Sequence, residues 1–207
     1  MFDSRASGIL LHLTSLPSRW GVGDLGDEAY KFVDFLSKNS QQVWQILPIG
    51  PTRDGHSPYS SYSSLAGNPL LISLEKLVEE GLLARQNLSN LPQLNIERID
   101  YDKAIAIKFP LLKQACENFF NKATISKKKF QEFCKIQAYW LDDYALFMAI
   151  KEDQRASWNK WPSEIAQRLP EAIDTWTKYL EDAVYYHKFL QFQFFSQWKN
   201  LKQYANS

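Results

Sequence analysis

The chain has 207 residues, of which 45% are hydrophobic and 23% are charged, and its formal net charge is +1. These values are those of a globular protein with one domain, or one domain with an insertion, and they exclude extensive disorder. A charge this close to zero gives no general attraction to nucleic acid or to an anionic membrane, and no apolar run is long enough to predict a membrane span.

The first elements predicted are two short strands separated by a helix. Residues 8–12 form an apolar run between loop signals, which is typical of a buried strand. A loop rich in Ser, Pro and Gly follows over 13–26, and then an amphipathic helix over 27–38. A second buried strand is expected over 42–47. Strand, helix and strand in this order predict a βαβ unit with parallel strands.

The remainder of the chain is expected to be mostly helical. The polar stretch 84–101 has the character of a loop. One βαβ unit cannot cover both faces of a parallel sheet, so the pattern predicts an incomplete α/β domain with a helical insertion. The expected helices are a short one at the end of 71–83 and longer ones near 102–120, 127–153 and 171–204, with breaks at Pro110, Pro162 and Pro170.

The segment Gly21–Gly26 matches the dinucleotide-binding pattern G-x-G-x-x-G, and it opens a predicted helix. Two features argue against nucleotide binding. The loop from Leu13 to Trp20 separates the first strand from the first glycine, and no acidic residue ends the second strand. The favoured interpretation is a loop in which the glycines supply turns with positive φ.

The loop over 50–69 holds the strongest indication of a binding site. It leaves the carboxyl end of the second predicted strand, where parallel α/β proteins bind their ligands. Pro58 is expected to stiffen the position of Tyr59. The alternative is an ordinary surface loop. Groups suited to a neutral, hydroxyl-rich ligand are supplied here by Asp54, His56, Ser57, Tyr59, Tyr62 and Asn68.

Several separated segments resemble the amylomaltase family of 4-α-glucanotransferases. The first two are SGILLHLTSLPSRWGVGDLGDEAYKFVDFL and QVWQILPIGPTRDGHSPYSSYSSLAGNPLLISLEKL. The resemblance continues through DDYALFMAIK (142–151), WNKWP (158–162) and FLQFQFFSQWKNLKQYAN (189–206). It covers nearly the whole chain, in order and with compatible spacing.

The resemblance implies an α/β fold, namely an incomplete (β/α)₈ TIM barrel represented by its first βαβ unit, with an inserted and mostly helical subdomain. Residues 1–69 would begin the catalytic barrel and carry the substrate loop, and 70–170 would form the inserted subdomain. Residues 171–207 would be a long helix returning to the barrel, and the remainder of the barrel would be absent.

The resemblance also implies an enzyme that moves α-1,4-glucan segments from maltooligosaccharides, starch or glycogen to a sugar acceptor. The reaction retains stereochemistry and uses a carboxylate nucleophile with a carboxylic acid–base, so no metal or other cofactor is expected. The family's three carboxylates lie beyond the stretch that resembles 189–206, and no position here matches their motifs. We therefore assign no catalytic residue and expect this fragment to be inactive alone.

The resemblance assigns substrate contacts to the loop over 50–69. Tyr59 would be the aromatic platform beside the cleavage subsite, Ser57 a nearby polar contact, and His56 a possible sugar contact. His12 is interpreted as structural. Arg53 stands where the family often has Gly. Some members of the family use a Tyr near position 54 at a remote glucan groove. This chain has Asp54 at that position, so we do not assign such a groove to it.

Two aromatic residues outside the loop leave alternatives open. Trp158 and Trp161 are candidates for lining a glucan groove, although helix packing is the favoured interpretation. For the chain as a whole, the alternatives to a transferase are a glucan-binding protein without catalysis and an α-glucan hydrolase of the same clan. Both would share the aromatic platform.

The N-terminal segment and the cysteines predict a cytoplasmic protein. The apolar stretch near the N-terminus is too short for the core of a signal peptide. Cys116 and Cys134 give no disulfide framework, and no Cys/His cluster has zinc spacing. We expect two buried or part-buried thiols in a reducing cytosol.

Overall fold

The computed structural model describes residues 5–53, 55–121 and 125–207, and it divides into two compact units. Unit 1 comprises Met1–Lys122 and Gln193–Ser207, and unit 2 comprises Ala123–Phe192. Helix α8 (Glu181–Ala205) contributes residues to both. The division into a barrel start, an insertion and a returning helix remains a prediction.

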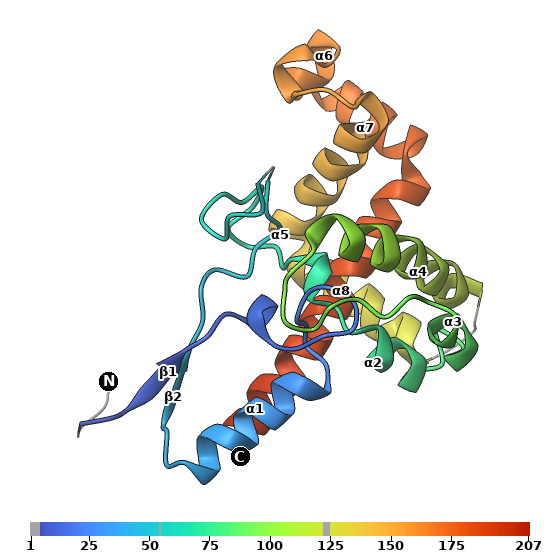
Figure 1. Cartoon of the computed structure of the whole chain (residues 1–207). Helices are drawn as coiled ribbons and strands as arrows, with labels where there is room; N and C mark the ends of the chain where they lie inside the picture. The colour runs from blue at the N-terminus through green and yellow to red at the C-terminus, as the bar shows by residue number, and fades with distance from the viewer. Residues whose placement is uncertain (1–4, 54, 122–124) are drawn as a thin grey trace. The chain divides into compact units, whose positions relative to one another are not determined.

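Unit 1 contains the predicted βαβ unit. Strands β1 (Gly8–Leu10) and β2 (Val43–Gln45) pair in parallel, with Gly8 opposite Val43, and helix α1 (Asp27–Lys38) lies between them in the chain (Figure 1). The predicted bounds of α1 are confirmed. A Cβ atom on Gly8 would lie only 2.3 Å from the carbonyl oxygen of Val43, so a side chain does not fit in this pairing.

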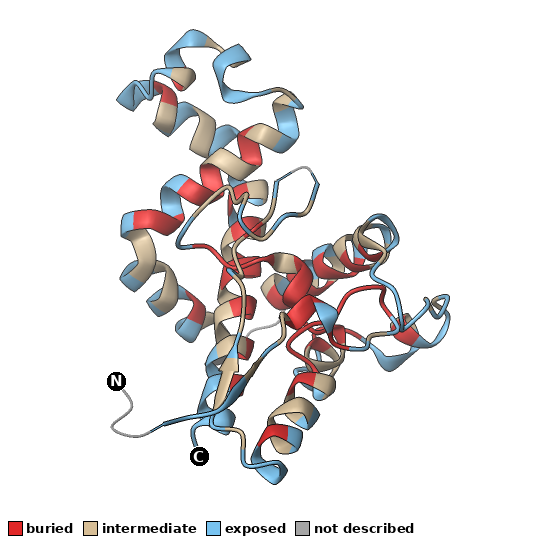
Figure 2. Ribbon diagram, turned by 60° about the vertical axis from the view of Figure 1, so that its left-hand side comes forward, coloured by how far each residue is buried: buried red, intermediate tan, exposed pale blue. Residues whose placement is uncertain are grey.

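Neither strand is buried, and the prediction of buried strands is wrong for the described residues. Leu10 is 56% exposed, and the residues of both strands are exposed or intermediate (Figure 2). The apolar runs were expected to lie inside a larger sheet, because parallel strands become buried when further strands and helices cover them. Among the described residues the sheet has two strands.

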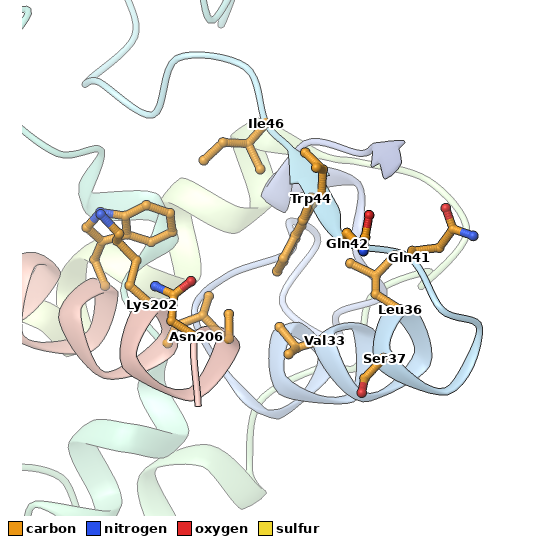
Figure 3. A pocket seen from close by; sticks show the side chains of 13 residues that line it. Val33, Leu36, Ser37, Gln41, Gln42, Trp44, Ile46, Lys202 and Asn206 are labelled. Atoms are coloured by element: carbon orange, nitrogen blue, oxygen red, sulfur yellow. The ribbon is translucent and has the colours of Figure 1, made fainter. Parts of the chain in front are cut away.

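A large apolar hollow lies beside this sheet. Its volume is about 660 Å³, and α1, β2 and the end of α8 form its walls. Figure 3 shows Val33, Leu36, Trp44 and Ile46 around it, with the polar Lys202 among the lining residues. The indole of Trp44 donates to the carbonyl oxygen of Leu11 at 2.7 Å, which fixes the ring against β1. The hollow is an uncovered continuation of the hydrophobic core.

The other helices of unit 1 are α2 (Leu74–Glu79), α3 (Arg85–Ser89) and α4 (Tyr101–Asn121). Helix α3 lies in the stretch predicted as a loop, because five residues are too few to show a helical period. Pro110 was predicted to break a helix, yet it lies inside α4. The buried Leu111 and Leu112 lie beside it, and their packing offsets the backbone hydrogen bond that proline cannot donate.

The C-terminal part of α8 packs within unit 1 against residues from the first half of the chain. The backbone N–H of Ser73 donates to Oε1 of Gln197 at 2.8 Å, and Nε2 of Gln197 donates to the carbonyl oxygen of Ser73 at 3.3 Å. Near the end of the helix, the hydroxyl of Tyr204 donates to Oδ1 of Asp34 at 2.6 Å. These contacts fasten α8 to both α2 and α1.

Unit 2 is helical in its described residues. It contains α5 (Ile125–Gln154), the 3₁₀ turn η3 (Trp158–Lys160), α6 (Ser163–Ala166), α7 (Pro170–Tyr179) and the first part of α8. The single helix predicted over 171–204 is wrong, because the chain turns at Leu180, which caps α7 in a non-helical conformation. The core includes Leu146, Ala149, Ile150, Ile165 and Val184.

The thiols have the environment expected of inert cysteines. Cys116 is buried and Cys134 is part-buried. Burial raises the pKa of Cys134 to about 11, so its reactive thiolate form is scarce at neutral pH. In the ranges that the structure describes, no helix has the length and apolar character needed to cross a bilayer.

The glycine-rich loop is a packing element in this structure. Residues 20–26 are all buried, which leaves no open cradle for a phosphate. Gly21 has a φ of +81°, which agrees with the interpretation that glycine supplies a turn with positive φ. Gly23 allows the close approach of the Leu13 backbone, because a Cβ at this position would lie 2.2 Å from the carbonyl oxygen of Leu13. The nucleotide-binding alternative therefore has no support from the geometry.

A buried ion pair fixes this loop to α4. Nζ of Lys108 lies 2.8 Å from Oδ2 of Asp24, and the two side chains are 0% and 9% exposed. The other carboxylate oxygen of Asp24 accepts from the N–H of Gly26 at 3.0 Å. Burial raises the pKa of Asp24 above its usual 3.8, against the opposing attraction of Lys108. Removing Lys108 would leave a buried carboxyl without its counter-charge.

We predict that Lys108→Met lowers the free energy of unfolding by about 3–5 kcal/mol in urea denaturation at pH 7. A carboxyl whose folded pKa is raised binds its proton more tightly in the folded state, so it stabilises the fold in acid and loses that contribution as pH rises through the raised pKa. The loss in Lys108→Met should therefore be smaller at pH 4 than at pH 7.

Lys103→Met is the matched control, because Lys103 lies on the same helix and pairs with Asp100 at the exposed surface. It should change stability little. Equal losses for the two variants, or a loss in Lys108→Met that does not depend on pH, would contradict the role given to the buried pair.

Candidate functional site

The loop after β2 is held in one conformation by backbone hydrogen bonds. At its base the N–H of Asn68 donates to the carbonyl oxygen of Ile49 at 2.8 Å. Further along, the N–H of Arg53 donates to Ser60 at 2.9 Å and that of Tyr62 to Pro51 at 3.0 Å. The two sides of the loop therefore run antiparallel and close together, and backbone hydrogen bonds between them order the loop.

A tight turn at the tip presents Tyr59. The N–H of Ser60 donates to the carbonyl oxygen of Ser57 at 3.0 Å, which makes Pro58 and Tyr59 the central residues of a β-turn. Proline favours the first central position because its ring fixes φ near the required value. The N–H of Tyr59 donates to Oγ of Ser57 at 3.4 Å. The Tyr59 side chain is 76% exposed, so its ring is available to a ligand.

Tyr59 lines a second hollow of unit 1, with a volume of about 400 Å³. Phe195 and Trp198 from α8 line the same hollow, and Ser61 and Ser63 add hydroxyl groups. The sequence predicted a helix near 171–204, and this range includes Phe195 and Trp198. Nothing in the local sequence indicates that Phe195 and Trp198 lie beside the loop, because this contact depends on the tertiary position of α8.

The three predicted site residues share one turn but differ in environment. Ser57 and Tyr59 are exposed, whereas the ring of His56 stacks on Tyr101, the first residue of α4, at 4.3 Å between centroids and 15° between planes. Nδ1 of His56 is buried and has no hydrogen-bond partner among the described residues. The sequence analysis missed Tyr101, since nothing in the local sequence links it to the loop.

The remaining candidates have simpler positions. His12 precedes the 3₁₀ turn η1 (Leu13–Ser15), and burial lowers its pKa, which favours the neutral ring. Its Nδ1 is buried without a hydrogen-bond partner among the described residues, so its structural role remains a prediction. Asp54 lies outside the described residues. The described residues of 50–69 carry no carboxylate, and the one cation among them, Arg53, lies 5.7 Å from the ring centre of Tyr62. The loop offers stacking and hydrogen bonds, and it lacks an acid–base pair in its described part.

The loop leaves the carboxyl end of a parallel strand pair and presents an exposed aromatic ring beside serine hydroxyls. Comparisons with known proteins place the chain in a family. Residues 11–207 match the family model for 4-alpha-glucanotransferase, glycoside hydrolase family 77. The 4-alpha-glucanotransferase of Synechocystis sp. is 54% identical over all of this chain, and that of Thermus thermophilus is 43% identical over 98% of it. The chain spans 41% and 40% of the lengths of these two relatives.

Solved structures show the same relationship. The amylomaltase from Streptococcus agalactiae in complex with acarbose is 38% identical, with a TM-score of 0.92 over 98% of this chain and 41% of its own. The amylomaltase from Corynebacterium glutamicum is 19% identical with a TM-score of 0.75, over 99% of this chain and 29% of its own, which shows the fold alone. The chain belongs to the 4-alpha-glucanotransferase family.

We predict that the stack of His56 on Tyr101 holds the loop closed. Tyr101→Leu removes the aromatic partner, whose stacking is worth about 0.5–1.5 kcal/mol, so local opening should become about 2- to 10-fold more frequent. Hydrogen exchange at the amides of Arg53 and Tyr62 measures that opening. Tyr59→Ala is the control, since its exposed ring does not brace the loop. Unchanged exchange in Tyr101→Leu would show that the backbone bonds suffice.

Proposed function

We propose that the whole protein is a 4-α-glucanotransferase that transfers α-1,4-glucan segments from maltooligosaccharides, starch or glycogen to a sugar acceptor. Membership of the family supports the reaction, and the exposed Tyr59 on its rigid turn is the observation that carries the proposal in this structure. A retaining mechanism would use a carboxylate nucleophile and an acid–base, with a sugar hydroxyl capturing the glycosyl intermediate in place of water.

The fold proposed for the whole protein is a (β/α)₈ barrel, of which β1, α1 and β2 are the first βαβ unit. The parallel pairing of the strands supports this, as does the high TM-score to the Streptococcus agalactiae amylomaltase. The exposed strands and the apolar hollow beside them are the surfaces against which further strands would pack. In barrels of this type the active site lies at the carboxyl ends of the strands, where the loop with Tyr59 begins.

Within this chain the proposed contacts are with substrate. The ring of Tyr59 would stack on the apolar face of a glucosyl unit, and the hydroxyl of Ser57 would hydrogen-bond to the sugar. His56 is the third proposed contact, and its stacked ring limits it to an edge-on approach. We propose that the catalytic carboxylates come from outside these residues, that no cofactor takes part, and that the protein is cytoplasmic.

A glucan-binding protein without catalysis, or an α-glucan hydrolase of the same clan, would show the same platform. Activity measurements separate the three. A transferase converts maltotriose into glucose and longer dextrins, a hydrolase forms shorter products only, and a binding protein forms none.

We predict that the 207-residue chain alone yields neither glucose nor longer dextrins from maltotriose, because the described residues of its candidate loop lack a carboxylate pair. A protein extended to the length of its relatives should yield both. The products are separated by chromatography. Appreciable transfer by the 207-residue chain would show that carboxylates within it perform the chemistry, and the assignment of the acids elsewhere would be wrong.

In the extended protein, Tyr59→Ala should lower kcat/KM for maltotriose by about 5- to 150-fold, because a ring buried against a ligand contributes roughly 1–3 kcal/mol. Tyr59→Phe should retain most of the activity, since it keeps the stacking face. Tyr179→Ala removes a similarly exposed ring from unit 2 and is the control. If kcat/KM of Tyr59→Ala equals that of this control, Tyr59 does not contact the substrate.

A further inference from the structure

Unit 2 contains a hollow of its own, separate from the loop after β2. Its volume is about 370 Å³, enough for one or two sugar rings. Three aromatic residues line it, namely Phe147 of α5 with Trp158 and Trp161, and the floor includes the buried Ile150 and Ile165. Aromatic faces of this kind are apolar surfaces that the C–H face of a sugar packs against.

The two tryptophans have different roles in this hollow. The indole N–H of Trp161 donates to the carbonyl oxygen of Ala156 at 3.0 Å, and its ring lies 5.3 Å from that of Phe147. Trp161 therefore packs as the sequence analysis favoured. Trp158 is 59% exposed at the edge of the same hollow. Packing within the unit does not account for so large an exposed ring.

Trp158 lies on backbone that is already ordered by hydrogen bonds. It begins the 3₁₀ turn η3, in which the N–H of Trp161 donates to the carbonyl oxygen of Trp158 at 3.2 Å and the N–H of Lys160 to that of Ser157 at 2.8 Å. A preformed surface loses little conformational entropy on binding.

The rim of the hollow supplies hydrogen-bonding groups without net charge. Nη2 of Arg168 lies 2.6 Å from Oδ1 of Asp143, and both side chains are more than half exposed. Arg168 has a φ of +59°, an unfavourable conformation for a residue with a side chain, and its N–H donates to the carbonyl oxygen of Ile165. The remaining guanidinium N–H groups and the second carboxylate oxygen suit neutral hydroxyls, while the paired charges favour neither an anion nor a cation.

We propose that this hollow is a glucan-binding site distinct from the loop of Tyr59, with a glucosyl ring stacked on Trp158 and its hydroxyls bonded to Arg168 and Asp143. The identity of the sugar rests on the proposed function, because the geometry alone specifies a neutral, hydroxyl-rich ring. A site of this kind would hold a long glucan and would add nothing to the binding of a substrate too short to reach it.

Electrophoresis of the 207-residue chain through native gels containing amylopectin tests the site. Amylopectin should retard the unaltered chain. Trp158→Ala should raise the dissociation constant for amylopectin about tenfold or more, and Trp158→Phe should keep part of the binding. Tyr139→Ala is the matched control, because it removes a ring that is 75% exposed on α5 and does not line the hollow. Circular dichroism confirms that each variant is folded.

Retardation of Trp158→Ala equal to that of Tyr139→Ala would overturn the proposal, as would an unaltered chain that amylopectin does not retard. Loss of retardation in Tyr59→Ala alone would place the binding in unit 1 and overturn it as well. The proposed transferase activity is judged separately with maltotriose. If the extended protein shows no transfer but amylopectin still retards it in a manner that depends on Trp158, the proposed transferase activity would be wrong and the proposed glucan-binding site would stand.

Discussion

The contact on which much of unit 1 depends is the buried ion pair between Lys108 and Asp24. A charge pair out of water persists only if each partner neutralises the other, so the distance between the glycine-rich loop and α4 is tightly constrained. Val22 of that loop packs in one cluster with Leu70 and Ala104, and Tyr101 packs against the same cluster. The pair and the cluster together set where α4 begins.

The position of α4 then bears on the candidate site. Its first residue, Tyr101, stacks on His56, and His56 lies three positions before Tyr59 in the loop. The same loop is closed at its base by Asn68 and Ile49. A chain of contacts thus runs from a buried charge pair to an exposed aromatic ring. The result is an exposed aromatic ring on an ordered turn, which we propose as a platform for a sugar, and the described residues of this loop contain no carboxylate.

The sequence was most informative where local chemistry determines the structure. The bounds of α1 followed from its amphipathic pattern, and the parallel strands followed from the order of strand, helix and strand. The restriction of Tyr59 by Pro58 was predicted because proline restricts φ, whereas the β-turn that holds both residues was seen only in the structure. The sequence left open whether Trp158 and Trp161 pack in the core or line a groove. In the structure the indole of Trp161 is hydrogen-bonded to Ala156, whereas Trp158 is 59% exposed.

The incorrect predictions of helix ends and burial occurred where tertiary contacts override local sequence preferences. Pro110 remains inside α4 because its buried neighbours pack there. The turn at Leu180 was not predicted because no glycine or proline marks it in the sequence. The strands were expected to be buried because their residues are apolar, although burial depends on partners that a short segment cannot reveal. Tyr101, Phe195 and Trp198 came to the loop through folding across long sequence separations.

The central claim is that the turn after β2 presents Tyr59 to an α-glucan. A crystal structure of the protein with a bound maltooligosaccharide tests it most directly. We expect a glucosyl ring to lie flat on the ring of Tyr59, with the hydroxyl of Ser57 within hydrogen-bonding distance of the sugar. Protein atoms covering the face of Tyr59, with the sugar bound away from this turn, would contradict it.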